Sequence, residues 1–73
     1  MKGLKEIRKQ KGFNQQYVAR KLNISREALS YYENSKREPS FATLNAMSKF
    51  FNVSIDYLIN GKEFSKNNKS HSL

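Results

Sequence analysis

Residues 14–34 read NQQYVARKLNISREALSYYEN and contain two helical patterns separated by a break of three residues. Asn14 and Ser25 belong to the residue types that cap helix N-termini, so each predicts the start of a helix. We expect the first helix to end near Leu22, because Asn23 tolerates a left-handed turn better than any residue except glycine. The second helix is expected to continue to the end of the quoted stretch.

The second helix of this pair has two faces of different chemistry. The residues that can be buried occupy one half of its surface and are Ala28, Leu29, Tyr32 and Glu33. The other half carries hydrogen-bonding side chains, namely Arg26, Glu27, Ser30, Tyr31 and Asn34. This pattern alone fits an ordinary solvated helix equally well. The break is too short for an antiparallel hairpin, however, so the two helices are expected to cross steeply. That is the helix-turn-helix arrangement, which sets its second helix into the major groove of DNA.

Three further helices are predicted around the pair, over residues 2–11, 40–51 and 55–59, from their apolar periodicity, caps and glycine stops. No stretch alternates apolar and polar residues with the β-branched enrichment of a strand. The predicted fold class is therefore all-α, a compact five-helix bundle over residues 1–61 that contains a helix-turn-helix. Residues 62–73 hold mainly Ser, Asn and Lys and are predicted to be a flexible basic tail.

The charge of the chain points to an acidic partner. The 73 residues include 14 Lys and Arg against 6 Asp and Glu, a net charge of +8. Residues 1–60 contain 11 of the basic and 5 of the acidic residues, so the excess is not confined to the tail. Nucleic acid is the first partner expected and an anionic membrane surface the second. The basic residues are spread over several helices, which disfavours the membrane, and lysines that only keep a small domain soluble would give the same charge.

Several classes of site have no support in the sequence. There is no cysteine, and the single histidine, His71, lies in the tail, so neither a disulfide nor a Cys/His zinc site is expected. No cofactor or small-molecule ligand is predicted. The sequence has no glycine-rich phosphate loop and no nucleophile–base pair, which argues against an enzyme. It also has no stretch typical of a membrane span or a signal peptide, so a cytoplasmic protein is expected.

Seven pieces of the chain between residues 4 and 58 follow one known pattern. They are Gln15, Val18-Ala19, Ile24-Ser25-Arg26, Leu29-Ser30, Tyr32-Glu33, Lys36-Arg37-Glu38-Pro39-Ser40 and Val53-Ser54-Ile55-Asp56-Tyr57-Leu58. Through these pieces the chain resembles the phage-repressor and Cro-like helix-turn-helix family, also called the xenobiotic-response-element type, and its lambda-repressor-like DNA-binding domain. Asn23 stands where that family commonly has glycine. Glu27 and Tyr31 lie at positions that vary within the family and commonly set its sequence preference, so the resemblance implies no target sequence.

The resemblance implies that the helix starting at Ser25 is a recognition helix. Its candidate base contacts are Arg26, Glu27, Ser30 and Tyr31. Arg26 has the paired donors that guanine O6 and N7 accept, and Glu27 can accept from cytosine N4 or hold Arg26 in place. Tyr31 offers its ring to a thymine methyl or its hydroxyl to a phosphate, although a partly buried surface aromatic would give the same pattern.

Candidate phosphate contacts lie at the start of the preceding helix and just after the recognition helix. They are Gln15, Gln16, Asn34, Lys36 and Arg37. Contacts of this kind fix the register on the duplex and make affinity sensitive to salt. Plain exposure to solvent explains Gln16 equally well, and a solvated charge run is the alternative for Lys36 and Arg37.

Two further sets of residues are assigned to structure and assembly. Arg8 and Glu33 lie at the edges of buried faces and, as the resemblance also implies, are predicted to form an inter-helix ion pair that fixes the angle of the recognition helix. Phe13, Phe41 and Phe51 are predicted to lie in the core. An exposed apolar patch near the last helix is predicted to be a homodimer interface. Its candidate residues are Phe50, Ile55, Tyr57, Leu58 and Ile59.

The expected function is that of a sequence-specific transcriptional regulator that binds double-stranded DNA. We expect a repressor that binds a palindromic operator as a homodimer, with two recognition helices about one turn (~34 Å) apart. Activation by contact with polymerase fits the same residues. The alternative is an antitoxin-like or anti-repressor module that uses the same fold to bind a partner protein.

Overall fold

The computed structural model describes residues 1–61, and the tail predicted over residues 62–73 lies outside the described residues. The described part contains five helices and no strand: α1 (Lys2–Gln10), α2 (Gln15–Leu22), α3 (Arg26–Glu33), α4 (Phe41–Phe51) and α5 (Ile55–Asn60). The all-α, five-helix prediction is therefore confirmed, and the predicted bounds agree with the observed ones to within a residue at each end. None of these helices has the length and apolar content needed to cross a membrane.

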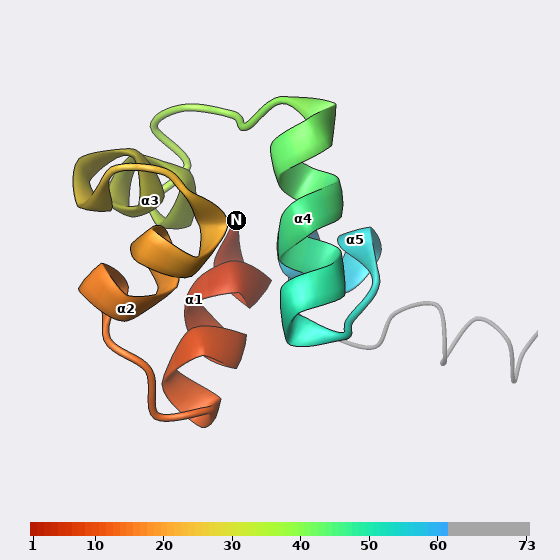
Figure 1. Cartoon of the computed structure of the whole chain (residues 1–73). Helices are drawn as coiled ribbons and strands as arrows, with labels where there is room; N and C mark the ends of the chain where they lie inside the picture. The colour runs from red at the N-terminus through yellow and green to blue at the C-terminus, as the bar shows by residue number, and fades with distance from the viewer. Residues whose placement is uncertain (62–73) are drawn as a thin grey trace, which may run out of the picture.

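The helices form two pairs on either side of α1 (Figure 1). α2 and α3 pack against each other on one side, and α4 and α5 on the other. α1 contacts both α3 and α5, and α4 also contacts α2. All five helices contribute to one core, whose buried apolar residues are Leu4, Ile7, Val18, Ala19, Leu29, Met47, Phe51 and Leu58. The α2–α3 pair is thereby held rigidly against the rest of the molecule.

The helix starts follow from capping side chains. The capping residues of α2 to α5 are Asn14, Ser25, Ser40 and Ser54. Each side-chain oxygen accepts a hydrogen bond from the backbone N–H three residues later, at 2.8 to 3.2 Å. The first turn of a helix leaves such N–H groups without an intrahelical partner, so the caps stabilise these starts. The helix starts are therefore set locally, which explains why the sequence located them.

α1 and α5 approach so closely that the contact requires a glycine. Gly3 is buried in the first turn of α1, and a Cβ atom added there would overlap the carbonyl oxygen of Tyr57. Glycine is unfavourable inside a helix, so close packing rather than helix propensity explains this residue. The periodicity of the sequence contains no signal for the contact.

Two predicted positions are wrong. Phe41, expected in the core, is 73% exposed. It lies roughly a quarter to a third of a turn around α4 from Met47 and Phe51, which are the buried residues of that helix. Leu58, expected on an exposed patch, is fully buried. A helix as short as α5 has one position per turn that faces the core, and Leu58 occupies it. Phe51 is buried as expected, and Phe13 is half-buried against the core.

Candidate nucleic-acid interface

The turn between α2 and α3 sets the two helices across each other. Asn23 takes the left-handed conformation, with φ 60° and ψ 43°, as its position after α2 predicts. The backbone N–H of Ile24 then donates to the carbonyl oxygen of Ala19 at 2.9 Å, which closes the end of α2. Ala19 is 3% exposed, and its small side chain permits close packing there. Ser25 follows immediately as the cap of α3.

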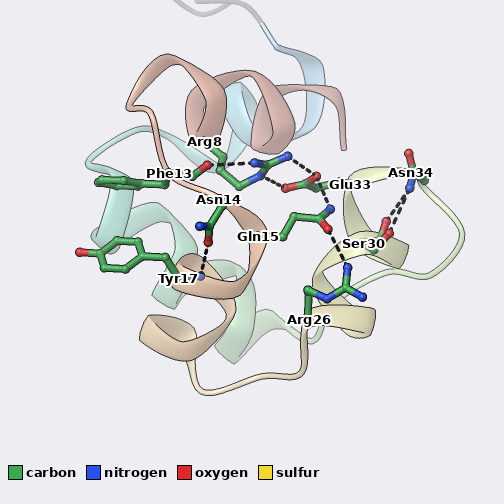
Figure 2. Close-up of polar contacts among 9 residues, drawn as sticks. All are labelled: Arg8, Phe13, Asn14, Gln15, Tyr17, Arg26, Ser30, Glu33 and Asn34. Atoms are coloured by element: carbon green, nitrogen blue, oxygen red, sulfur yellow. Dashed lines mark hydrogen bonds and ion pairs between the residues drawn. The ribbon is translucent and has the colours of Figure 1, made fainter.

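The outward face of α3 collects the four candidate base contacts. Arg26, Glu27 and Tyr31 are exposed, and Ser30 is half-buried. At the end of the helix the side-chain amide of Asn34 donates to the carbonyl oxygen of Ser30 at 2.9 Å and to its hydroxyl at 3.4 Å (Figure 2). This face therefore carries mainly polar side chains, while Leu29 and Glu33 of α3 are buried.

A buried ion pair joins α1 to α3. Nε of Arg8 donates to Oε2 of Glu33 at 2.6 Å, and Nη2 of Arg8 donates to Oε1 of Glu33 at 3.1 Å. The third donor of Arg8, Nη1, reaches the carbonyl oxygen of Phe13 at 2.9 Å. The side chains of Arg8 and Glu33 are only 10% and 1% exposed. The two residues expected to form an inter-helix pair thus do so, in the bidentate geometry that fixes orientation most firmly.

Gln15 extends this pair to the surface (Figure 2). Its side-chain Nε2 donates to Oε1 of Glu33 at 3.1 Å, and its Oε1 accepts from Nη1 of Arg26 at 3.4 Å. The expectation for Gln15 was a phosphate contact at the start of α2. The structure places its amide between the buried carboxylate and the first residue of the outward face, which does not test that expectation. An amide nitrogen carries two hydrogens, so donation to Glu33 still leaves one for a phosphate.

The other candidate phosphate contacts surround this face. Gln16, Lys36 and Arg37 are all exposed, and the guanidinium of Arg37 lies over the ring of Tyr31. Sequence reasoning missed Arg20, which is exposed and lines an open hollow of about 310 Å³ between α2 and α3. The lining residues of that hollow are Gln16, Ala19, Arg20, Asn23, Ile24 and Arg26. The spacing of four between Gln16 and Arg20 puts both on one face of a helix and was the available signal.

The candidate dimer residues differ in how far they are buried. Ile59 is 48% exposed, whereas Phe50, Ile55 and Tyr57 are half-buried. The ring of Phe50 packs against those of Phe13 and Phe51, with centroid distances of 6.0 and 4.9 Å. A second hollow, of about 390 Å³, lies beside Ile59 and includes Leu44 and Pro39 in its lining. Only part of the expected patch is therefore open to a partner.

Comparison with known proteins shows that the chain is similar to helix-turn-helix proteins named as transcriptional regulators. A family model described as helix-turn-helix matches residues 4–58. The HTH-type transcriptional regulator ImmR of Bacillus subtilis (strain 168) is 44% identical over 72 residues, which cover 99% of this chain and 57% of the relative. The HTH-type transcriptional activator BcrR of Enterococcus faecalis is 40% identical over 60 residues, 82% of this chain and 29% of the relative.

Another Bacillus subtilis (strain 168) protein, the uncharacterized HTH-type transcriptional regulator YqaE, is 46% identical over 63 residues, 86% of this chain and 54% of the relative. The chain thus spans little more than half the length of the two Bacillus relatives, and less of the Enterococcus one. No solved structure gives a significant match.

Proposed function

Because the chain belongs to the Cro-like, xenobiotic-response-element type of helix-turn-helix family, we propose that it is a transcriptional regulator that binds double-stranded DNA with α3 in the major groove. One observation carries this proposal. The polar outward face of α3 is fixed from behind by the buried Arg8–Glu33 pair. A helix held at a fixed angle can present its donors and acceptors to base edges without being reoriented on binding.

We assign direct base contacts to three residues of α3, namely Arg26, Glu27 and Ser30, and Tyr31 lies beside them among the exposed residues of that helix. Arg26 is the strongest candidate, since its guanidinium can donate twice to one guanine. Gln15 holds the Nη1 group of Arg26 at 3.4 Å, which restricts the directions in which the other donors of Arg26 point.

Phosphate contacts flank these residues on both sides. We assign them to Gln15, Gln16, Asn34, Lys36 and Arg37, and we add Arg20 from its place in the hollow between α2 and α3. Basic and amide side chains there would grip the DNA backbone and fix the register of α3. The net charge of +8 supports this assignment.

In the cell, we propose that the protein is cytoplasmic and acts as a repressor that occupies a palindromic operator as a homodimer. Occupancy of a promoter blocks transcription without any further activity, and two α3 helices one turn (~34 Å) apart would match a palindrome. Ile59, with Leu44 and Pro39 beside it, supplies the apolar part of a pairing surface, and the same hollow is also lined by Lys2, Ser35, Arg37 and Glu38. One relative bears the name of an activator, so a reporter assay must determine the sign of the effect.

The experiment that tests DNA binding is selection of bound sequences from a random duplex pool, followed by affinity measurements on the selected and a scrambled sequence. We expect the selected sequence to bind at least roughly a thousandfold more tightly, and the affinity to fall steeply with salt. Equal affinity for both sequences, or an affinity that does not change with salt, would contradict the proposal.

Arg26→Ala tests the assigned contact. We expect a loss of about 1–3 kcal/mol in binding free energy and a relaxed preference at one base position, because the bidentate donor is removed. Lys49→Ala is the control, since it removes an exposed positive charge from the last turn of α4, away from α3. Repeating the selection with each variant shows whether the preference changes. Equal losses in both variants would mean that Arg26 contributes only charge.

A further inference from the structure

Tyr31 and Arg37 are in contact although they belong to different parts of the chain. Tyr31 lies in the last turns of α3 and is 43% exposed. Arg37 lies in the segment between α3 and α4. Its guanidinium carbon is 5.3 Å from the centroid of the Tyr31 ring and lies over the face of that ring. This is the distance range in which the ring attracts a cation.

The backbone after α3 brings Arg37 to this position. Ser35 takes the left-handed conformation, with φ 59°, which turns the chain back toward the helix. The N–H of Lys36 then donates to the carbonyl oxygen of Tyr31 at 2.8 Å, and the N–H of Ser35 donates to that of Tyr32 at 3.2 Å. The segment that carries Arg37 is therefore tied to the residue on which its side chain stacks.

Stacking changes what each of the two side chains can do. The guanidinium is planar and carries five N–H donors around its edge, so a ring on its face leaves those donors available. The ring of Tyr31, in turn, has one face covered by Arg37, which hinders flat contact of that face with a thymine methyl. A free arginine would have to lose many rotamers on binding, whereas a stacked one is already oriented.

We propose that the Tyr31 ring is a platform that positions the Arg37 guanidinium to donate to a DNA phosphate beside the bases read by α3. This inference rests on the proposed function, and it gives the two residues one shared role instead of a base contact and a separate backbone contact. Tyr31 acts through its ring and not through its hydroxyl. Arg37 is the residue that contacts DNA.

The test is a double-mutant cycle of binding to the selected duplex at several salt concentrations. Tyr31→Phe keeps the ring and is expected to bind within about twofold of the wild type. Tyr31→Leu and Arg37→Ala are each expected to lose about tenfold, the loss typical of one charge-assisted hydrogen bond. The double variant is also expected to lose about tenfold, because either change removes the same contact.

The salt dependence distinguishes this role from a structural one. Loss of one phosphate contact reduces the slope of log affinity against log salt by roughly 0.9, and we expect this in both Tyr31→Leu and Arg37→Ala. Lys36→Ala is the matched control, since it removes a neighbouring exposed charge that does not stack on Tyr31 among the described contacts. The double variant Lys36→Ala and Tyr31→Leu should lose affinity by the product of the two single fold-changes.

Two results would overturn the inference while leaving the proposed function intact. If Tyr31→Phe lost as much affinity as Tyr31→Leu, the hydroxyl would contact DNA directly. If the losses of Tyr31→Leu and Arg37→Ala multiplied, the two residues would act independently. Thermal unfolding of each variant checks that the fold is retained, as expected for exposed side chains. If Tyr31→Leu proves unstable, Tyr31→Phe and Arg37→Ala are compared instead. Tyr31→Phe should keep the affinity and salt slope of the wild type, and Arg37→Ala should lower both.

A measurement without DNA separates the platform from the proposed function. Protons of the Arg37 side chain above the ring should show an upfield ring-current shift in the nuclear magnetic resonance spectrum of the free protein. The shift should persist in Tyr31→Phe and vanish in Tyr31→Leu. Absence of the shift in the wild type would overturn the platform itself. A wild type that shows the shift but binds no duplex would overturn the proposed function, and with it the contact of Arg37 with DNA.

Discussion

Glu33 is the residue through which the candidate interface is attached to the core. Its two carboxylate oxygens accept three hydrogen bonds, two from Arg8 and one from Gln15. Gln15 in turn accepts from Arg26, so a continuous set of polar contacts runs from α1 through α3 to the surface. A buried charge without its partner is costly, which keeps the Arg8 and Glu33 side chains together, while Gln15 and Arg26 join them through single hydrogen bonds.

Removal of either member of the buried pair should destabilise the fold strongly. We expect Arg8→Met or Glu33→Leu to cost about 3–5 kcal/mol in the free energy of unfolding, because each leaves one buried charge unpaired. The double variant should cost less than the sum of the two, since no charge is stranded. Urea unfolding of the three variants measures this. A double variant that lost the full sum would show that the two residues do not interact.

Gln15→Ala should separate DNA affinity from stability. Gln15 is half-buried and links Glu33 to Arg26, so its loss is expected to cost about 1 kcal/mol of stability for one hydrogen bond. Affinity for the selected duplex should fall further than in Gln16→Ala, because Arg26 also loses its support. Gln16 is the adjacent exposed amide and serves as the matched control. Equal affinities for the two variants would mean that the support has no effect on binding.

At the scale of the elements, side-chain caps begin α2 to α5 and left-handed residues end α2, α4 and α5, while close contacts set how the helices lie. α1 is central because it contacts α3 on one side and α5 on the other. The contact with α5 depends on Gly3, whose missing side chain lets the two backbones meet. The position of α3 relative to the α4–α5 pair therefore depends on both ends of α1.

Gly3→Ala should destabilise the protein although alanine is the better helix former. The added Cβ would overlap the carbonyl oxygen of Tyr57, and relief requires α1 and α5 to move apart. We expect a cost of about 1–3 kcal/mol, typical of overpacking, in place of the gain of about 1 kcal/mol that helix propensity would give. Thermal or urea unfolding shows whether the free energy of unfolding falls or rises in this variant.

Gly12→Ala is the comparison for this variant. A Cβ at Gly12 meets nothing within 4 Å, but its φ of +77° is strained for alanine. Its cost should be about 1 kcal/mol and should come from the backbone alone. If Gly3→Ala stabilised the protein, the close approach of α1 and α5 would be disproved.

At the scale of the whole molecule, the polar face of α3 and the two most exposed large apolar residues belong to different helix pairs. The α2–α3 pair carries the outward polar face, and the α4–α5 pair lies across α1 from it (Figure 1). Phe41 and Ile59, the most exposed apolar residues of the described part, belong to α4 and α5. The hollow beside Ile59 is also lined by Ser35 and Arg37, so a partner bound there would lie next to the segment that follows α3.

Ile59→Glu should weaken self-association without unfolding the protein. Ile59 is 48% exposed and lines the hollow beside α5, so a charge there opposes burial against a second copy. We expect sedimentation equilibrium to show more monomer and binding to a full palindrome to fall toward that of a half-site. Phe41→Glu tests the same side from α4. If neither variant changed the oligomeric state, pairing would not involve this surface.

The sequence alone determined the helices, the turn between α2 and α3, and the ion pair between Arg8 and Glu33. Caps and apolar periodicity act within a few residues, so they can be read from the sequence. A charged residue at the edge of a buried face needs a partner of opposite charge, which makes Arg8 and Glu33 candidates for a pair. The outward face of α3 followed from the same periodicity. The helices, the turn and the outward face of α3 needed no knowledge of which distant segments meet, whereas the pairing of Arg8 with Glu33 was also implied by the family resemblance.

Only the tertiary structure decided which apolar residues are buried and which polar groups meet across elements. Phe41 is as apolar as Met47 and Phe51, yet the way α4 packs leaves Phe41 exposed. Leu58 is buried because α5 packs with that residue toward the core. Gln15 stands between Glu33 and Arg26 because three helices converge there. The physical reason is that burial and long-range hydrogen bonds depend on the angles between packed helices, which local patterns do not specify.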